Sequence, residues 1–223
     1  YLRLDKDIAE ILTYLDAQYG KDQVLVFLTA DHAVAEVPGY ANSKKLPGGV
    51  FDRNGSISDM KKAINQAFGN VDLLVGEENS QLYFNHSLMT KMGIDSKKLF
   101  DVVRKSYQKQ EGFSELVDLL DIPSANLNAQ YTQLIINGYH PARSGDFMIL
   151  LKPSWFMGSQ TGTTHSTLYS YDTHVPLLFY GWKVKPAEII KRTSISDISV
   201  TLANWLHISE PSGSIGNVIT QIP

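Results

Sequence analysis

The chain has 223 residues, 43% hydrophobic and 19% charged, a composition typical of a globular domain with a buried core. Its 20 Lys and Arg against 23 Asp and Glu give a formal net charge of −3, which argues against binding to nucleic acid polymers. It contains no cysteine, which excludes disulfides, thiolate metal sites and cysteine nucleophiles. Any metal must therefore be held by His, Asp, Glu or backbone oxygen. No apolar run approaches the roughly 20 residues that span a bilayer, so no membrane span is expected.

The first 29 residues predict a helix followed by a buried strand. Residues 3–19 carry apolar side chains at spacings of three and four, which indicates an amphipathic helix ending at Gly20. The run Val-Leu-Val-Phe-Leu-Thr over 24–29 predicts a strand that is buried on both faces, as in a parallel sheet. Helix, short loop and buried strand together indicate an α/β fold with a doubly wound, mainly parallel sheet flanked by helices.

The rest of the chain mixes short strands with helices. Residues 70–145 combine a hairpin with helices, which predicts an α+β subdomain inserted between the strands that carry the chemistry. The expected elements, in chain order, are a loop over 35–57, a helix over 59–68 capped by Ser58, hairpin strands at 71–75 and 81–85, helices at 96–110, 113–120 and 125–136, strands at 147–151 and 177–180, and a helix over 196–206.

Two polar side chains, Asp31 and His32, follow the first predicted strand directly. Ligands of open α/β sheets bind just beyond the carboxyl ends of strands, and carboxylate oxygen and imidazole nitrogen suit Zn²⁺. The alternative is that Asp31 caps the following turn and His32 is a partly buried polar residue. The dipeptide by itself favours this alternative.

A second candidate motif is Gly-Thr-Thr-His-Ser over 162–166. A small, flexible loop lets His165 approach a metal without crowding, although it is equally typical of a surface loop with an incidental histidine. Tyr169 and Tyr171 either pack around this loop or stack against a substrate. Asp172 and His174 are not expected to bind the metal directly, and His174 is either structural or a partner of a ligand or substrate. His86 and His140 are interpreted as structural. Arg143 is interpreted as structural and paired with Asp146, although an arginine could also bind phosphate.

In combination, several motifs resemble the alkaline phosphatase superfamily. They are Phe-Leu-Thr-Ala-Asp-His over 27–32, the run from Gly162 to Pro176, Pro-Ala-Arg-Ser-Gly-Asp over 141–146, and Ile-Ser-Asp-Ile-Ser-Val-Thr-Leu over 195–202. The chain is most similar to the type I phosphodiesterase/nucleotide pyrophosphatase branch. Within that branch it resembles bacterial periplasmic alkaline phosphatases with a threonine nucleophile.

The resemblance implies roles for three residues. Asp31 and His32 match the pair that binds the zinc beside the nucleophile, and His165 matches a histidine on the other zinc of a two-Zn²⁺ site. The family's remaining ligands and its nucleophile precede Tyr1. We therefore expect the C-terminal part of one alkaline phosphatase-like domain, with the N-terminal part missing and no catalytic nucleophile in this chain. The three ligands are expected to converge above the sheet.

The implied function is hydrolysis of small phosphate monoesters through a covalent phospho-Thr intermediate in the full-length protein, with this chain alone inactive. Two alternatives remain open: a phosphodiesterase or nucleotide pyrophosphatase of the same branch, and a non-catalytic binding domain on the same scaffold. The resemblance also implies a periplasmic or secreted protein whose partner is a small phosphate ester.

Overall fold

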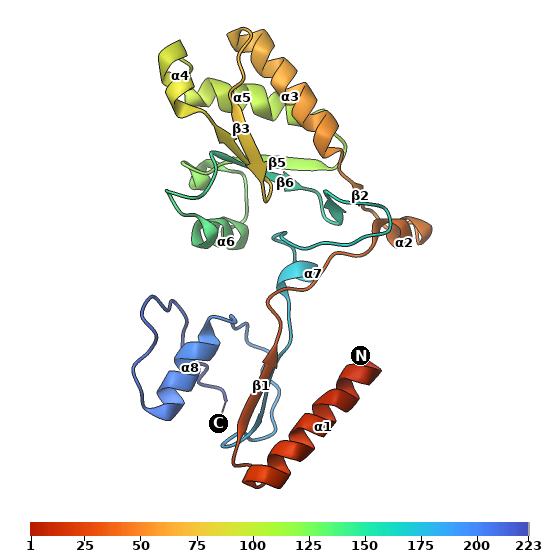
Figure 1. The fold of residues 1–223 in the computed structure, drawn as a ribbon, viewed down its shortest axis with the longest axis vertical. Helices are drawn as coiled ribbons and strands as arrows, with labels where there is room; N and C mark the ends of the chain where they lie inside the picture. The colour runs from red at the N-terminus through yellow and green to blue at the C-terminus, as the bar shows by residue number, and fades with distance from the viewer. Residues whose placement is uncertain (223) are drawn as a thin grey trace. The chain divides into compact units, whose positions relative to one another are not determined.

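The computed structural model describes residues 1–222, which divide into two compact units. Unit 1 comprises Tyr1–His32 and the segment from His174 onward, and unit 2 comprises Ala33–Thr173. Figure 1 traces both along the chain from red to blue. No helix within the described residues is long and apolar enough to cross a membrane.

Unit 1 contains two helices and a two-stranded sheet. The helices are α1 (Leu2–Tyr19) and α8 (Asp197–Leu206), and the strands are β1 (Leu25–Thr29) and β8 (Leu177–Gly181). Gly20 ends α1 with a φ of 90°, a conformation that favours glycine. All four elements were predicted from the sequence, and their existence and type are confirmed.

The neighbours of β1 differ from those expected. The strand pairs antiparallel with β8, from Leu25 opposite Gly181 to Thr29 opposite Leu177. Phe27 and Leu28 are 42% and 38% exposed, so the prediction of a strand buried on both faces of a parallel sheet is wrong for the described residues. An apolar run predicts that a strand tends to be buried, but it does not identify the strands or helices that would cover it.

Unit 2 is built on a four-stranded antiparallel sheet in the order β3-β4-β6-β5, and β2 pairs separately with β7 in parallel. It contains all of residues 70–145, and their status as an insertion stays a prediction. Its elements are α2 (Pro38–Ser43), β2 (Gly49–Val50), α3 (Arg53–Phe68), β3 (Leu74–Glu78), β4 (Gln81–Phe84), α4 (His86–Met92), α5 (Ser96–Tyr107), β5 (Phe113–Asp118), a 3₁₀ turn (Ile122–Ser124), α6 (Ala129–Gly138), β6 (Phe147–Leu151), β7 (Trp155–Phe156) and α7 (Ser170–Thr173).

The two faces of this sheet bury different clusters, because successive side chains of a strand point to opposite sides. On β6, Phe147 and Ile149 belong to the main core, which α3 and α5 cover, whereas Met148 and Leu150 pack with residues of α6 (Figure 1). Phe147 contacts the ring of Phe84 at 5.4 Å between centroids. The central strand β6 therefore belongs to both clusters.

Three predicted elements of unit 2 need correction. Residues 113–118 form strand β5 instead of a helix, because they pair with β6 from Phe113 opposite Leu151 to Asp118 opposite Phe147. Helix α3 starts at Arg53, five residues before the predicted N-cap, since the side chain of Asp52 accepts the Gly55 N–H at 3.0 Å. The predicted loop over 35–57 contains α2 and β2.

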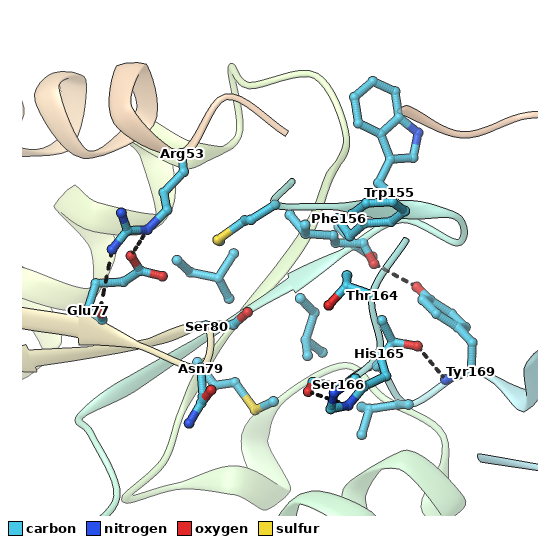
Figure 2. A pocket seen from close by; sticks show the side chains of 18 of the residues that line it. Arg53, Glu77, Asn79, Ser80, Trp155, Phe156, Thr164, His165, Ser166 and Tyr169 are labelled. Atoms are coloured by element: carbon cyan, nitrogen blue, oxygen red, sulfur yellow. Dashed lines mark hydrogen bonds and ion pairs between the residues drawn. The ribbon is translucent and has the colours of Figure 1, made fainter. Parts of the chain in front are cut away.

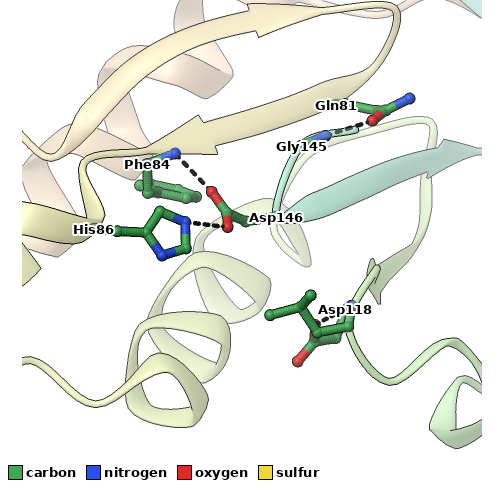
Figure 3. Close-up of polar contacts among 7 residues, drawn as sticks. Gln81, Phe84, His86, Asp118, Gly145 and Asp146 are labelled. Atoms are coloured by element: carbon green, nitrogen blue, oxygen red, sulfur yellow. Dashed lines mark hydrogen bonds and ion pairs between the residues drawn. The ribbon is translucent and has the colours of Figure 1, made fainter. Parts of the chain in front are cut away.

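A polar contact ties the start of β6 to β4 (Figure 3). One carboxylate oxygen of Asp146 accepts the backbone N–H of Phe84 at 2.7 Å, and the other lies 2.6 Å from His86 Nε2. Next to it, the Gly145 N–H donates to the Gln81 side chain at 2.7 Å. The partner of Asp146 is thus His86, and the expected pairing of Asp146 with Arg143 is not observed.

Candidate metal centre and adjoining pocket

The Asp31-His32 pair lies just past the end of β1, as the sequence predicted. The His32 backbone N–H donates to Asp31 Oδ1 at 3.0 Å, and His32 Nε2 lies 3.8 Å from Asp31 Oδ2. The Asp31 side chain is 87% exposed and that of His32 is 36% exposed. Two bonds of about 2.0–2.2 Å to one Zn²⁺ can join donors up to about 4 Å apart. The pair therefore fits a shared cation in both chemistry and separation.

His165 belongs to a loop of unit 2 that hydrogen bonds fix on both sides of it. On one side, the Ala35 N–H donates to the Thr164 carbonyl at 3.0 Å, and the Thr163 hydroxyl donates to the Ala35 carbonyl. At the ring itself, Ser166 Oγ lies 3.1 Å from His165 Nδ1. A contact at one ring nitrogen fixes the orientation of an imidazole. His165 as a whole is exposed.

Asp172 holds the other side of this loop. It is only 2% exposed, and its Oδ2 accepts the Thr167 N–H at 2.6 Å. Its backbone carbonyl accepts the N–H of Ala33, the residue that follows His32, at 2.8 Å. Its Oδ1 is buried and has no hydrogen-bond partner among the described residues. These contacts are those of a structural residue that positions the loop.

The predicted ligands are divided between the two units. Asp31 and His32 belong to unit 1 and His165 belongs to unit 2, so their convergence on one site stays a prediction. Within residues 1–222, no three His, Asp or Glu side chains form a group that could hold a metal.

A pocket of about 380 Å³ in unit 2 was not predicted from the sequence. Figure 2 shows Arg53 and Glu77 at one end of it and His165, Ser166 and Tyr169 at the other. Its lining comes from the start of α3, the end of β3 with the turn after it, β5, α6 with the residues before it, β6, β7 and the loop over 164–169. Seven segments that are far apart in the chain leave no local sequence signature. The only prior signal was the proximity of Tyr169 to the His165 motif.

Two tyrosines form part of the pocket lining. Tyr169 and Tyr131 contact edge to face, with ring centroids 5.9 Å apart and an interplanar angle of 88°. The Tyr169 hydroxyl donates to the Leu151 carbonyl at 2.8 Å. Burial first, and then the neighbouring phenols of Tyr171 and Tyr131, raise the pKa of Tyr169. Its hydroxyl therefore stays a neutral donor, and its ring is held in place.

The family of the chain follows from comparison with known proteins. Residues 1–176, a range that includes Asp31, His32 and His165, match the family described as Type I phosphodiesterase / nucleotide pyrophosphatase. The chain belongs to this family. The resemblance drawn from the motifs is therefore confirmed.

Individual relatives agree with this assignment. The chain is 35% identical to alkaline phosphatase PafA of Elizabethkingia meningoseptica and 37% identical to alkaline phosphatase PhoV of Synechococcus elongatus, in both cases over 100% of its length. It is 35% identical over 99% of its length to a Myroides odoratus protein named calcium-transporting ATPase. The crystal structure of wild-type PafA matches all of the chain with a TM-score of 0.91 at 34% identity. The alkaline phosphatase-like α/β fold is thus confirmed.

The match covers only part of each relative. The chain spans 41% of PafA, 40% of PhoV and 42% of the PafA chain in the crystal structure. The family and the named phosphatases support a phosphoric ester hydrolase. The activity of a whole protein that contains these residues is a matter of proposal.

Proposed function

We propose that residues 1–223 are part of a metal-dependent hydrolase of phosphate monoesters. The observation that carries the proposal is the match to two alkaline phosphatases over the whole chain, within a family whose matched range includes all three predicted ligands. The donor pair after β1 supports it, because its atoms are close enough to share one cation.

Each predicted ligand has a defined role in this proposal. Asp31 and His32 bind the Zn²⁺ beside the nucleophile, and His165 binds a second Zn²⁺. Such a pair of ions supplies charge neutralisation for both the attacking and the leaving oxygen of a phosphoryl transfer. Ser166 holds the His165 ring through Nδ1, and Asp172 fixes the loop through Thr167. Orientation of ligands by such neighbours strengthens metal binding.

The nucleophile in this proposal is a threonine outside residues 1–223, which forms a covalent phospho-Thr intermediate that water then hydrolyses. The relatives are more than twice as long as this chain. We therefore propose that residues 1–223 do not turn over substrate by themselves. We also propose a periplasmic or secreted location and a small phosphate ester as the substrate.

Phosphodiester hydrolysis is the second candidate, because the matched family is named for phosphodiesterases and nucleotide pyrophosphatases. A non-catalytic binding domain is the third. The names of two relatives at 35% and 37% identity favour monoester hydrolysis over both.

The test uses the protein expressed from its complete coding sequence. We compare kcat/KM for 4-nitrophenyl phosphate and bis(4-nitrophenyl) phosphate, and we measure bound zinc, in the unaltered protein and in His32→Ala and His165→Ala. Loss of a ligand should lower monoesterase activity more than about 100-fold and release zinc. His140→Ala is the control, because His140 is exposed and its ring accepts the nearby backbone N–H of Ala142 at 3.2 Å.

Four outcomes would count against the proposal. Full zinc content and activity in His165→Ala would remove His165 from the site. A higher kcat/KM for the diester would favour the phosphodiesterase, and no turnover of either ester would favour the binding domain. Turnover by residues 1–223 alone would show that the nucleophile is not outside them.

A further inference from the structure

The pocket beside His165 is larger than a metal site requires. At about 380 Å³ it falls within the range of roughly 300–1,000 Å³ typical of small-molecule sites. Of its lining residues, the proposed chemistry uses His165 as a ligand, and Ser166 and Thr167 only to hold the His165 loop. The remaining walls therefore have the size and position to contact a part of the substrate other than the reacting phosphorus.

One wall of the pocket is apolar and partly open. Leu127, Met148, Leu150 and Leu168 line it and pack against the smaller core cluster on the α6 side of the sheet. All four are only half-buried. Covering such surface with an apolar group is worth about 25 cal/mol for each Å² removed from water. This wall favours an apolar ligand surface.

An aromatic pair adjoins this wall. Tyr131 comes from α6 and Tyr169 from the His165 loop, and both rings are half-buried. Because the Tyr169 hydroxyl is bonded to the Leu151 carbonyl, its ring keeps one orientation. Aromatic rings prefer edge-to-face or offset contacts with further rings. A flat aromatic ligand can therefore make favourable ring contacts with both tyrosines.

At the opposite end of the pocket, the positive charge of Arg53 is paired with Glu77. Its Nε bonds to the carboxylate of Glu77, and its Nη2 donates to the Glu77 carbonyl at 3.4 Å. The Glu77 side chain is 4% exposed, so the pair is held by a buried carboxylate. Glu78 adds a further negative charge to the lining. Aside from His165, the lining is thus net negative, and it disfavours an anionic group.

We propose that this pocket binds the alcohol part of the phosphate ester, and that it selects an uncharged aromatic alcohol. The inference rests on the proposed function, because His165 connects the pocket to the phosphoryl group. Aryl phosphate monoesters place a flat apolar ring next to the phosphate. Their ring would lie against Tyr131, Tyr169 and the apolar wall.

The first test compares 2-naphthyl phosphate with glycerol 2-phosphate in the protein expressed from its complete coding sequence. Tyr131→Leu should lower the ratio of their kcat/KM values by about 3- to 10-fold, the range expected for one lost aromatic contact. The matched control is Tyr139→Leu. Tyr139 is half-buried and packs against the same cluster but does not line the pocket.

The second test concerns charge and uses an exposed position. The unaltered protein should prefer phenyl phosphate over 4-carboxyphenyl phosphate, and Glu78→Gln should reduce that preference. Glu111→Gln is the control, because Glu111 is exposed and outside this pocket. Both experiments measure ratios of two substrates, so a general loss of folded enzyme does not affect them.

The outcomes separate this inference from the proposed function. If neither ester is hydrolysed, both proposals are overturned together. If both esters are hydrolysed and Tyr131→Leu leaves the ratio unchanged, only the pocket assignment is overturned. An equal effect of Tyr139→Leu, or a preference for the carboxylated ester, would also overturn it.

Discussion

The two units achieve their burial in different ways. Unit 2 has a continuous core in which α3 and α5 cover one face of its sheet, and side chains such as Met60, Leu99 and Val103 are completely buried. In unit 1, α1 has no buried residue at all. The buried apolar side chains there come from α8 and the C-terminal segment: Ile198, Val200, Ala203, Ile219 and Ile222.

Unit 1 relies instead on a buried polar network. The Asp197 carboxylate accepts the N–H groups of Ser194 at 2.9 Å and Asn217 at 2.8 Å. The Thr201 hydroxyl donates to the Asp197 carbonyl at 2.7 Å and accepts the Ile219 N–H at 2.9 Å. The two units are thus held together differently: an apolar core stabilises unit 2, whereas in unit 1 directional hydrogen bonds join α8 to the end of the chain.

The largest expected effect tests the core of unit 2. In residues 1–223, Leu99→Ala removes a side chain that is 0% exposed, and it should lower the free energy of unfolding by about 2–5 kcal/mol because it leaves a cavity. The matched change in unit 1 is Leu28→Ala at a side chain that is 38% exposed. Exposed sites usually change stability by less than about 0.5 kcal/mol.

The measurement is urea unfolding followed by fluorescence. Trp155 lies in unit 2, and Trp182 and Trp205 lie in unit 1, so replacing one set by Phe assigns the signal to a unit. Similar losses of unfolding free energy for the two leucine variants would mean that the β1–β8 sheet is as tightly packed as the unit 2 core. The two units would then not differ in their packing.

The second effect tests the polar network of unit 1. Thr201→Val keeps the shape of the side chain but removes its hydroxyl, which leaves the Ile219 N–H without its acceptor. Leaving a buried group unsatisfied costs about 1–3 kcal/mol. Thr13→Val is the control, because its hydroxyl bonds to the Ala9 carbonyl on an exposed face of α1. If the two variants unfold at the same urea concentration, the network does not stabilise unit 1.

Much of the fold could be predicted where local pattern and tertiary partners agree. Apolar spacing gave α1, and a short apolar run gave β6, which is central in its sheet. Residues 113–120 were misread because Phe113, Leu116 and Val117 also have helical spacing. These residues form a strand because they pair with β6, which lies about 30 residues further along the chain and so outside any local sequence pattern.

In the candidate site, too, some features follow from local sequence and others depend on tertiary contacts. The position of Asp31 and His32 at a strand end follows from local sequence and is confirmed. The contacts of Asp172 and the pocket walls bring together segments far apart in the chain, such as Arg53 with Glu77 and Tyr131 with Tyr169. Such contacts depend on how the elements pack, so a single sequence carries no direct sign of them.

The smallest expected effect appears only in alkaline solution. Burial raises the pKa of Tyr107, a core residue of unit 2 that is 1% exposed, and the negative charge of Glu77 adds to the shift. The stability that its neutral hydroxyl contributes is complete below the unfolded-state pKa of about 10 and falls as the pH rises through that value toward the folded-state pKa. The loss is at most about 1.4 kcal/mol for each pH unit.

Unit 2 should therefore lose stability between pH 9 and pH 11 as the pH rises. Tyr107→Phe should make the unfolding free energy of unit 2 less dependent on pH in this interval. Urea unfolding at each pH, with the tryptophan reporters of each unit, provides the measurement. Equal slopes for Tyr107→Phe and the unaltered protein would show that the Tyr107 hydroxyl reaches water in the folded state, so that the core of unit 2 is more open at this side chain than its burial indicates.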